Sequence, residues 1–287
     1  MSNCKLYYSL KLLGIIGENP LTSESVMKKI IFLSFIFVAP TYTWEWPNVS
    51  SYFKKKETEA KTQEFALSPD STVFITNDEG TITCKGWNQN KIMVETIKKG
   101  PKEHFEHVRI NITTTPKQIT IAPQFDNGVS NFPIDFIIMV PKHCAQITAF
   151  IQKGNIKIKE CPASLELSVE QGNVAVHHAT RTVTAKTNAG NIKVKQKALP
   201  ETETIFIEAT KGNVLLKTAP KIHGNLQAKT THGVVSSSVY ITLEPQTTKL
   251  NKEYWARIKK EVIGALGNGG APITIDVTRG NIAIEEL

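Results

Sequence analysis

The chain has 287 residues and carries a formal net charge of +8 at pH 7. A basic chain favours anionic partners such as glycans, lipid headgroups or nucleic acid. It has four cysteines, of which three follow residue 26, and this odd number argues against a fold held together by a framework of disulfides.

The first predicted element is a secretory signal peptide over residues 27–43. Met27 and two lysines precede the apolar run Ile30–Ala39, which is shorter than the roughly 18 residues of a membrane span. Residues 1–26 do not fit such a signal, so we predict that Met27 is the true start. An extended signal or a cytoplasmic tail is the alternative for this segment, and a buried core helix is the alternative for the apolar run.

Residues 44–70 are predicted to be a linker, because Lys54–Lys61 is charged and poor in apolar residues. The rest, 71–287, is ample for one domain. It opens with an alternating strand pattern around Gly80, and Ile92–Glu95 and Ile134–Val140 are predicted to be further strands.

A repeated glycine corner dominates the domain. Around each corner glycine, apolar or small residues stand seven, five and three positions before and two and four positions after it. The corner glycines are Gly154, Gly172, Gly190, Gly212, Gly233 and Gly280. Asn follows five of them, and Gly-Asn is a turn signal, so each unit is predicted to be strand, tight corner, strand.

Two all-β architectures fit this repeat: a β-solenoid, in which each unit is a coil stacked on the next, and an antiparallel meander of hairpins. The hairpin would place the residues that flank Gly-Asn on one face. Those before the glycine are mostly polar and those after Asn are apolar, which favours the solenoid. We therefore predict a single-domain β-solenoid of about seven coils.

The repeat is interrupted between the last two corners, which are 280 − 233 = 47 residues apart. Tyr254, Trp255, Ile258, Val262 and Leu266 recur there at helical spacing, and Gly267 follows as a helix-ending signal. The spacing predicts a helix over 251–267 that covers the solenoid or binds a partner.

Stacked coils would align outward side chains into columns, two of which are basic. One position before the corners stand Lys153, Gln171, Ala189, Lys211, His232 and Arg279, and five positions after them stand Lys159, His177, Lys195 and Lys217. Such columns can bind a polyanion, or they can be a solvated face that prevents aggregation. The candidate binding residues are Lys153, Lys159, His177, Lys195, Lys211 and Lys217.

Other chemistry is weakly indicated. Cys144 and Cys161 stand at similar offsets from successive corners and are a candidate disulfide, the alternative being two small buried thiols. The histidines lack partners at metal-ligand spacing, so no metal or other cofactor is expected. The acidic residues Glu166, Glu170, Glu208 and Asp276 are not expected to share an offset or to pair on neighbouring coils, so no catalytic residue is expected.

The order of four motifs resembles that of the bacterial putative adhesin family. The motifs are Gly80-Thr-Ile-Thr-Cys-Lys-Gly-Trp87, the strand ending at Glu95, the strand Phe136–Pro141 and the Gly-Asn-Ile coils. The resemblance covers about 71–287. It implies an exported β-helical domain of unassigned molecular function, and it supplies no catalytic residues.

We therefore expect an exported, non-enzymatic module of the periplasm, cell surface or medium, which binds an anionic glycan or another envelope component. No specific nucleic acid partner is expected, because base-stacking aromatics are missing from the basic columns. The alternatives are a polysaccharide lyase or hydrolase on the same scaffold, and a periplasmic protein-binding scaffold that uses the 251–267 helix.

Overall fold

The structure is a computed structural model and describes residues 57–68, 70–126, 128–130, 132–243 and 260–287. The chain divides into two compact units, Met1–Phe53 and Lys54–Leu287, and the described residues all lie in the second. The predicted extension 1–26 and the predicted signal 27–43 lie outside the described residues. No helix within the described ranges is long and apolar enough to cross a membrane.

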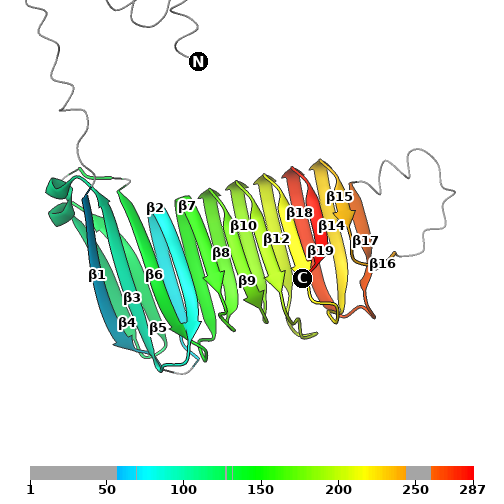
Figure 1. Cartoon of the computed structure of the whole chain (residues 1–287), viewed down its shortest axis with the longest axis horizontal. Helices are drawn as coiled ribbons and strands as arrows, with labels where there is room; N and C mark the ends of the chain where they lie inside the picture. Colours follow the sequence, from blue (N-terminus) through cyan, green and yellow to red (C-terminus); the bar gives the residue numbers. More distant parts are fainter. Residues whose placement is uncertain (1–56, 69, 127, 131, 244–259) are drawn as a thin grey trace, which may run out of the picture. The chain divides into compact units, whose positions relative to one another are not determined.

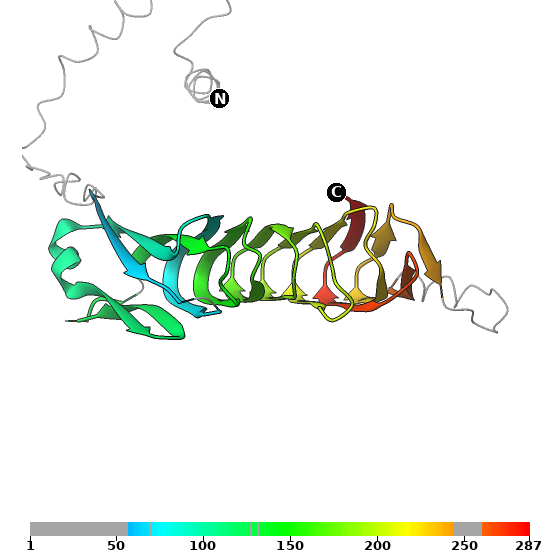
Figure 2. The same cartoon turned by 90° about the horizontal axis from the view of Figure 1, so that it is seen from below.

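The second unit is all-β, with strands that lie side by side like rungs and form two layers (Figures 1 and 2). In order, the first layer contains β4 (Val108–Thr115), β5 (Gln118–Phe125), the first halves of β2 (Thr72–Trp87) and β7 (Gln146–Lys159), β8 (Ser164–Gln171), β10 (Val183–Ala189), β12 (Ile205–Lys211), β18 (Ala271–Arg279), β14 (Gly224–His232), β17 (Glu261–Leu266) and β16 (Ile241–Leu243). The second layer contains β1 (Glu57–Ala66), β3 (Lys91–Gly100), β6 (Pro133–Pro141), the second halves of β2 and β7, β9 (Val174–Ala179), β11 (Ile192–Gln196), β13 (Val214–Thr218), β19 (Ile282–Glu286) and β15 (Val235–Ser237).

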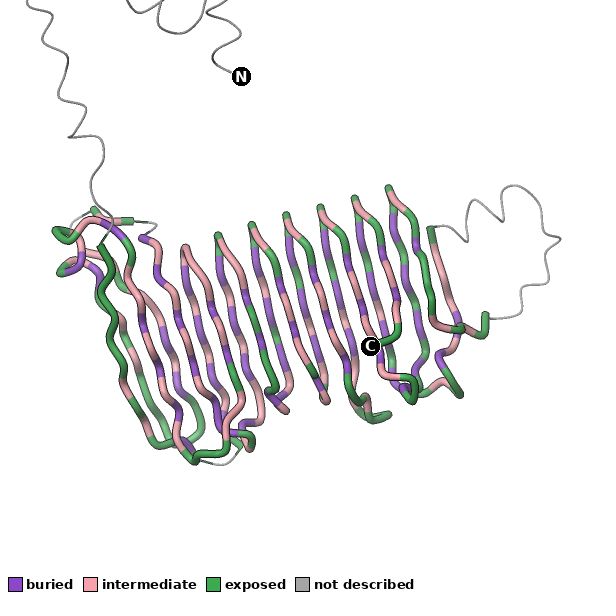
Figure 3. Tube along the Cα trace, in the orientation of Figure 1, coloured by how far each residue is buried: buried purple, intermediate pink, exposed green. Residues whose placement is uncertain are grey.

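The coils stack in parallel, which confirms the solenoid and excludes the meander. Ile147 on β7 pairs with Leu165 on β8, and Leu165 pairs with Val183 on β10, so equivalent positions of successive coils lie in register. The apolar positions of each coil point inward, and Figure 3 shows the resulting alternation of buried and more exposed residues along the strands. Each fully buried Ile or Leu stabilises the core by about 1.5–3 kcal/mol.

The corner glycines form a column in which no side chain fits. A Cβ on Gly172 would lie 1.7 Å from the carbonyl oxygen of Gly154, and a Cβ on Gly212 would lie 1.7 Å from that of Gly190. The φ angles at these two corners are +140°, a conformation that only glycine adopts readily. Gly80 belongs to the same column, because its carbonyl oxygen lies against Gly154.

An asparagine ladder runs beside the glycine column. The side-chain oxygen of Asn155 accepts a hydrogen bond from the backbone N–H of Asn173 at 3.2 Å, and that of Asn173 accepts one from Asn191 at 2.9 Å. The ladder continues from Asn191 to Asn213 and from Asn213 to Asn281. Backbone N–H groups at the corner are therefore satisfied by the neighbouring coil, which is why Asn recurs after Gly.

The coils do not stack in sequence order. β18 lies between β12 and β14, although it follows both along the chain. β2 likewise lies between β7 on one side and β5 and β6 on the other, although it precedes all three along the chain. The chain thus leaves the stack after β15 and returns to fill a position between coils that precede it in the sequence.

Two predicted boundaries are wrong. Glu57–Ala66, placed in the linker 44–70, is strand β1, paired along its length with β3. Of the predicted helix 251–267, Glu261–Leu266 is strand β17, because it pairs with β14 and β16 and buries Leu266 against the core. Residues 251–259 lie outside the described residues. The one helix of the described residues is a 3₁₀ helix, η3 (Lys102–His107), between β3 and β4.

A candidate anion-binding face

The basic column predicted one position before the corners is interrupted. Lys153 lies between Glu79 and Gln171, and Lys211 lies between Ala189 and Arg279. Two strands without a cation at this position therefore separate the two lysines. Lys211 instead joins Arg279 and His232 on neighbouring strands of the first layer.

The column predicted five positions after the corners is continuous. On the second layer, β7 pairs Lys159 with His177 of β9, and β11 pairs Lys195 with Lys217 of β13. His177 and Lys195 face each other across a register shift between β9 and β11. The column ends at Lys217, whose Nζ lies 2.8 Å from Oε2 of Glu285 on β19.

Three further lysines extend this face and were missed from the sequence. Lys85 on β2 pairs with Lys159 and stands five positions after Gly80, so the same offset rule would have found it. Lys157 and Lys193 stand three positions after their corners, and both pair with Ala175 of β9. We call Lys157, Lys159, Lys193 and Lys195 the four-lysine frame; none of the four forms a salt bridge with another described residue.

The pKa of His177 is affected by the positive charge of the surrounding lysines. Its pKa is lowered from its ordinary value, first because the side chain is partly buried and then because Lys195, Lys193 and Lys159 repel a further proton. The next residue, His178, has a φ of +60° and is exposed. Its Nδ1 lies 4.0 Å from Oε1 of Glu160, which places one carboxylate at the end of the frame.

The outer surface of the first layer is mixed in charge. Lys186 on β10 lies 3.2 Å from Glu208 on β12, and Glu208 pairs in register with Asp276 on β18. The expectation that these carboxylates would not pair on neighbouring coils is wrong. Both residues stand four positions before their corner glycines and so share an offset, and β18 lies directly beside β12.

The three cysteines of the described residues are buried free thiols near one another. Burial raises the pKa of Cys144 to about 11 and that of Cys161 to about 12, while the pKa of Cys84 is raised well above its ordinary value. The thiol of Cys144 donates to the backbone oxygen of Ser71 at 3.2 Å. The predicted Cys144–Cys161 bridge is not formed in the structure, and its formation on oxidation stays a prediction.

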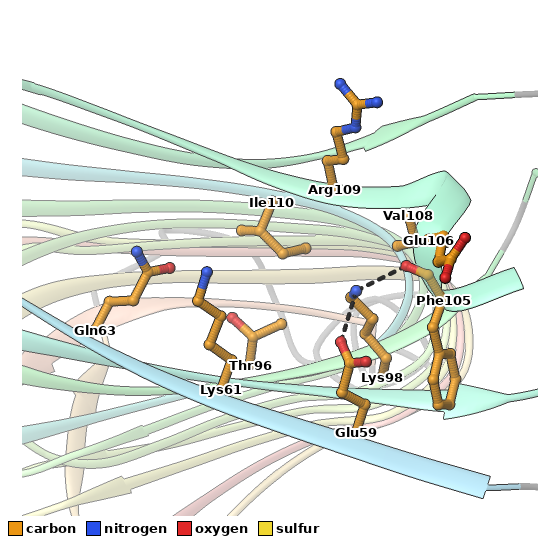
Figure 4. A pocket seen from close by; sticks show the side chains of 10 residues that line it. All are labelled: Glu59, Lys61, Gln63, Thr96, Lys98, Phe105, Glu106, Val108, Arg109 and Ile110. Atoms are coloured by element: carbon orange, nitrogen blue, oxygen red, sulfur yellow. Dashed lines mark hydrogen bonds and ion pairs between the residues drawn. The ribbon is translucent and has the colours of Figure 1, made fainter. Parts of the chain in front are cut away.

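A cavity of about 300 Å³ lies at the β1 end of the unit (Figure 4). Lys98 points into it, but its Nζ lies 2.8 Å from Oε1 of Glu59 and donates to the backbone oxygen of Phe105 at 2.9 Å. Arg109 points away from the other side chains and lies 3.4 Å from Asp126. Two of the cations that line the cavity, Lys98 and Arg109, are thus already paired with carboxylates. In the described part of the chain, no group of three or more His, Cys, Asp or Glu side chains is placed to hold a metal ion.

One family model matches the coil region of the chain. Residues 157–285 match the Toastrack DUF4097 family. The match confirms the resemblance to adhesin-like proteins of unknown function over the Gly-Asn coils, and the Gly80–Trp87 motif lies outside the matched residues. No protein of curated function matches the sequence.

Solved structures that match at low identity come from several bacteria. A putative cell adhesion protein from Clostridium sporogenes is 11% identical, with a TM-score of 0.44 over 80% of this chain and 100% of that chain. A putative adhesin from Bacteroides fragilis is 10% identical, with a TM-score of 0.26 over 80% and 97%. A putative lipid binding protein from Parabacteroides distasonis is 9% identical, with a TM-score of 0.24 over 79% and 96%. At these values the likeness carries no argument about function.

Proposed function

We propose that this protein is an exported, non-enzymatic β-solenoid that binds an anionic glycan or another anionic envelope component on the outer surface of its second layer. The observation that carries the proposal is the continuous column from Lys85 through Lys159, His177 and Lys195, widened by Lys157 and Lys193. A rigid sheet holds the backbone positions of these residues at strand spacing, about 4.8 Å, so the backbone does not have to be ordered when a polymer binds.

A glycan fits this face better than a nucleic acid. Unstacked bases need aromatic platforms, and in the described strands the two lysine columns contain no Phe, Tyr or Trp. Each lysine is a flexible point charge that tolerates different spacings of anionic groups along a polymer. The Toastrack match is consistent with a binding or structural module, which is the coarse role that the sequence predicts.

Binding to an array of sulfated, phosphorylated, carboxylated and uncharged glycans tests the proposal. We expect salt-sensitive binding to charged glycans that falls about tenfold in Lys193→Ala/Lys195→Ala, since each exposed contact contributes up to about 1 kcal/mol. The matched control is Lys153→Ala/Lys211→Ala, which removes the same charge from the first layer and should bind normally. Equal losses in both variants, or no binding to any polyanion, would refute the proposal.

A polysaccharide-active enzyme is the second candidate, and the register pair Glu208–Asp276 is the observation that favours it. Two carboxylates flanking a glycosidic bond are the usual apparatus of glycoside hydrolysis. Glu208 is already held by Lys186 at 3.2 Å, however, which fits a surface ion pair. Release of reducing ends or unsaturated sugars by the purified protein, abolished in Glu208→Gln, would establish the enzyme instead.

Export is a separate part of the proposal. Cell fractionation, together with mass spectrometry of the mature amino terminus, tests both the signal 27–43 and Met27 as the start. Recovery of an unprocessed protein from the cytoplasm would contradict it.

A further inference from the structure

The four-lysine frame has a geometry that a simple basic patch lacks. Lys157 and Lys159 come from β7, Lys193 and Lys195 come from β11, and β9 runs between them. Neighbouring strands lie about 4.8 Å apart and alternate residues about 7 Å apart. The four lysine Cα atoms therefore mark the corners of a rectangle of about 10 by 7 Å.

The middle of the rectangle is low and carries a titratable group. Ala175, between Lys157 and Lys193, has only a methyl group, so a ligand can approach the sheet there. His177, between Lys159 and Lys195, is partly buried, and the long lysine stems rise on both sides of it. A small anionic group above Ala175 would face four ammonium groups and one imidazole.

We propose that this frame binds a sulfate or phosphate ester group carried by a glycan, and that protonation of His177 strengthens the binding in acid. The inference rests on the proposed function. A tetrahedral oxyanion presents oxygens in several directions and can reach lysines on both β7 and β11. A carboxylate presents two oxygens in one plane and suits a bidentate partner instead.

The direction of the pH effect follows from the groups that face His177. Lys159 faces it from β7, and Lys193 and Lys195 act on it from β11, while Lys157 lies beside Ala175. His178 lies next to it in the chain and near Glu160. Without a ligand these cations disfavour the imidazolium, so His177 is neutral at pH 7. A bound oxyanion attracts the proton and raises the pKa of His177. By linkage, the affinity for the oxyanion rises as pH falls through the range between the pKa of the bound form and that of the free form.

The test uses the full chain and four dextrans of equal length: dextran sulfate, dextran phosphate, carboxymethyl dextran and uncharged dextran. Affinities are measured at fixed ionic strength. At pH 7.5 we expect the sulfate or phosphate polymer to bind about tenfold more tightly than the carboxymethyl polymer, and Lys157→Ala/Lys193→Ala to remove this preference. The stronger of the two ester polymers identifies the ester that the site prefers.

The pH series uses dextran sulfate, because phosphate monoesters themselves lose charge near pH 6. We expect wild-type binding about three- to tenfold tighter at pH 5.5 than at pH 7.5. His177→Ala should lose this increase whatever its affinity at pH 7.5, with circular dichroism confirming that it is folded. Retention of the full increase in His177→Ala would overturn the role of His177. Equal binding of carboxymethyl dextran would overturn the ester site while leaving the proposed function standing, and no binding to any dextran would overturn both.

Discussion

The backbone N–H of Val234 donates a hydrogen bond to the side-chain oxygen of Asn281, 3.0 Å away, although the two residues are 47 positions apart. Val234 follows the corner glycine Gly233, whereas an asparagine follows each of the other corner glycines from Gly154 onward. Among the described strands, β15 pairs only with β19, so no described coil lies beyond it to need an acceptor. The missing asparagine therefore marks the end of the ladder.

Cross-linking tests the stacking order. Lys211 and Arg279 are outward register partners on adjacent strands, so Lys211→Cys/Arg279→Cys should form a disulfide on mild oxidation. Lys211→Cys/His232→Cys should not, because β18 separates these strands and places them about 10 Å apart. The reverse result, read by mass spectrometry of non-reduced peptides, would show that coils stack in sequence order.

The asparagine ladder should stabilise the fold modestly. Asn213→Ala removes the acceptor of the Asn281 N–H, now 2.9 Å from it, and should lower the free energy of unfolding by about 0.5–1.5 kcal/mol in urea. Val234→Asn restores the repeat pattern at the end of the ladder, where nothing in the described structure would use it. A change within about 0.5 kcal/mol is expected there, and a gain similar to the loss in Asn213→Ala would contradict the assignment of that end.

Gly212 should tolerate no side chain. In Gly212→Ala the new Cβ would lie 1.7 Å from the Gly190 oxygen at a φ of +140°, so we expect a loss of about 3–5 kcal/mol or failure to fold. Gly128 is the control, because it has a φ of +72° with nothing within 4 Å. Gly128→Ala should cost only about 1–2 kcal/mol in thermal or urea unfolding. Similar losses in both would show that backbone strain, and not the close stacking, governs the corner.

The buried thiols should be unreactive in the native state. In a Cys4→Ser background, iodoacetamide at pH 8 should label none of the three thiols until the protein is unfolded, because burial raises their pKa values. After unfolding without reductant, three labels indicate free thiols, and a single label on Cys84 would establish the Cys144–Cys161 bridge.

The same shifts predict a pH dependence of stability. The folded-state pKa of Cys144 is about 11 and that of Cys161 is about 12, both above the ordinary value of 9.0. The unfolded chain therefore loses these protons first, and the free energy of unfolding should fall as pH rises above about 9. Cys144→Ala/Cys161→Ala should weaken this fall, as measured by urea midpoints between pH 8 and pH 10.5. A variant that keeps the wild-type slope would assign the alkaline loss to other groups.

Much of the coil was predictable because its constraints are local. Gly154, Gly172 and Gly190 stand at fixed intervals, and alternating apolar residues define the inside of each strand. The sequence could not show which coil lies beside which, since Ile273 and Leu226 fill the same inward position and either would pack against Ile205. The error over Glu208 and Asp276 follows only in part from this gap, because their shared offset is visible in the sequence. Lys157 and Lys193 share an offset, three positions after their corners, and this signal could have placed them on the same face.

The position of β18 between β12 and β14 imposes an order on how the chain assembles. During synthesis from the amino terminus, β14 emerges before β18, and the outer edge of β12 then offers it a partner with matching inward residues, Ile205 against Leu226. The side-chain oxygen of Asn213 can meanwhile accept a hydrogen bond from the backbone N–H of Val234 as readily as from that of Asn281. A prematurely closed stack of this kind must reopen before β18 enters, so strand exchange at β12 is the step expected to limit the rate at which native protein appears.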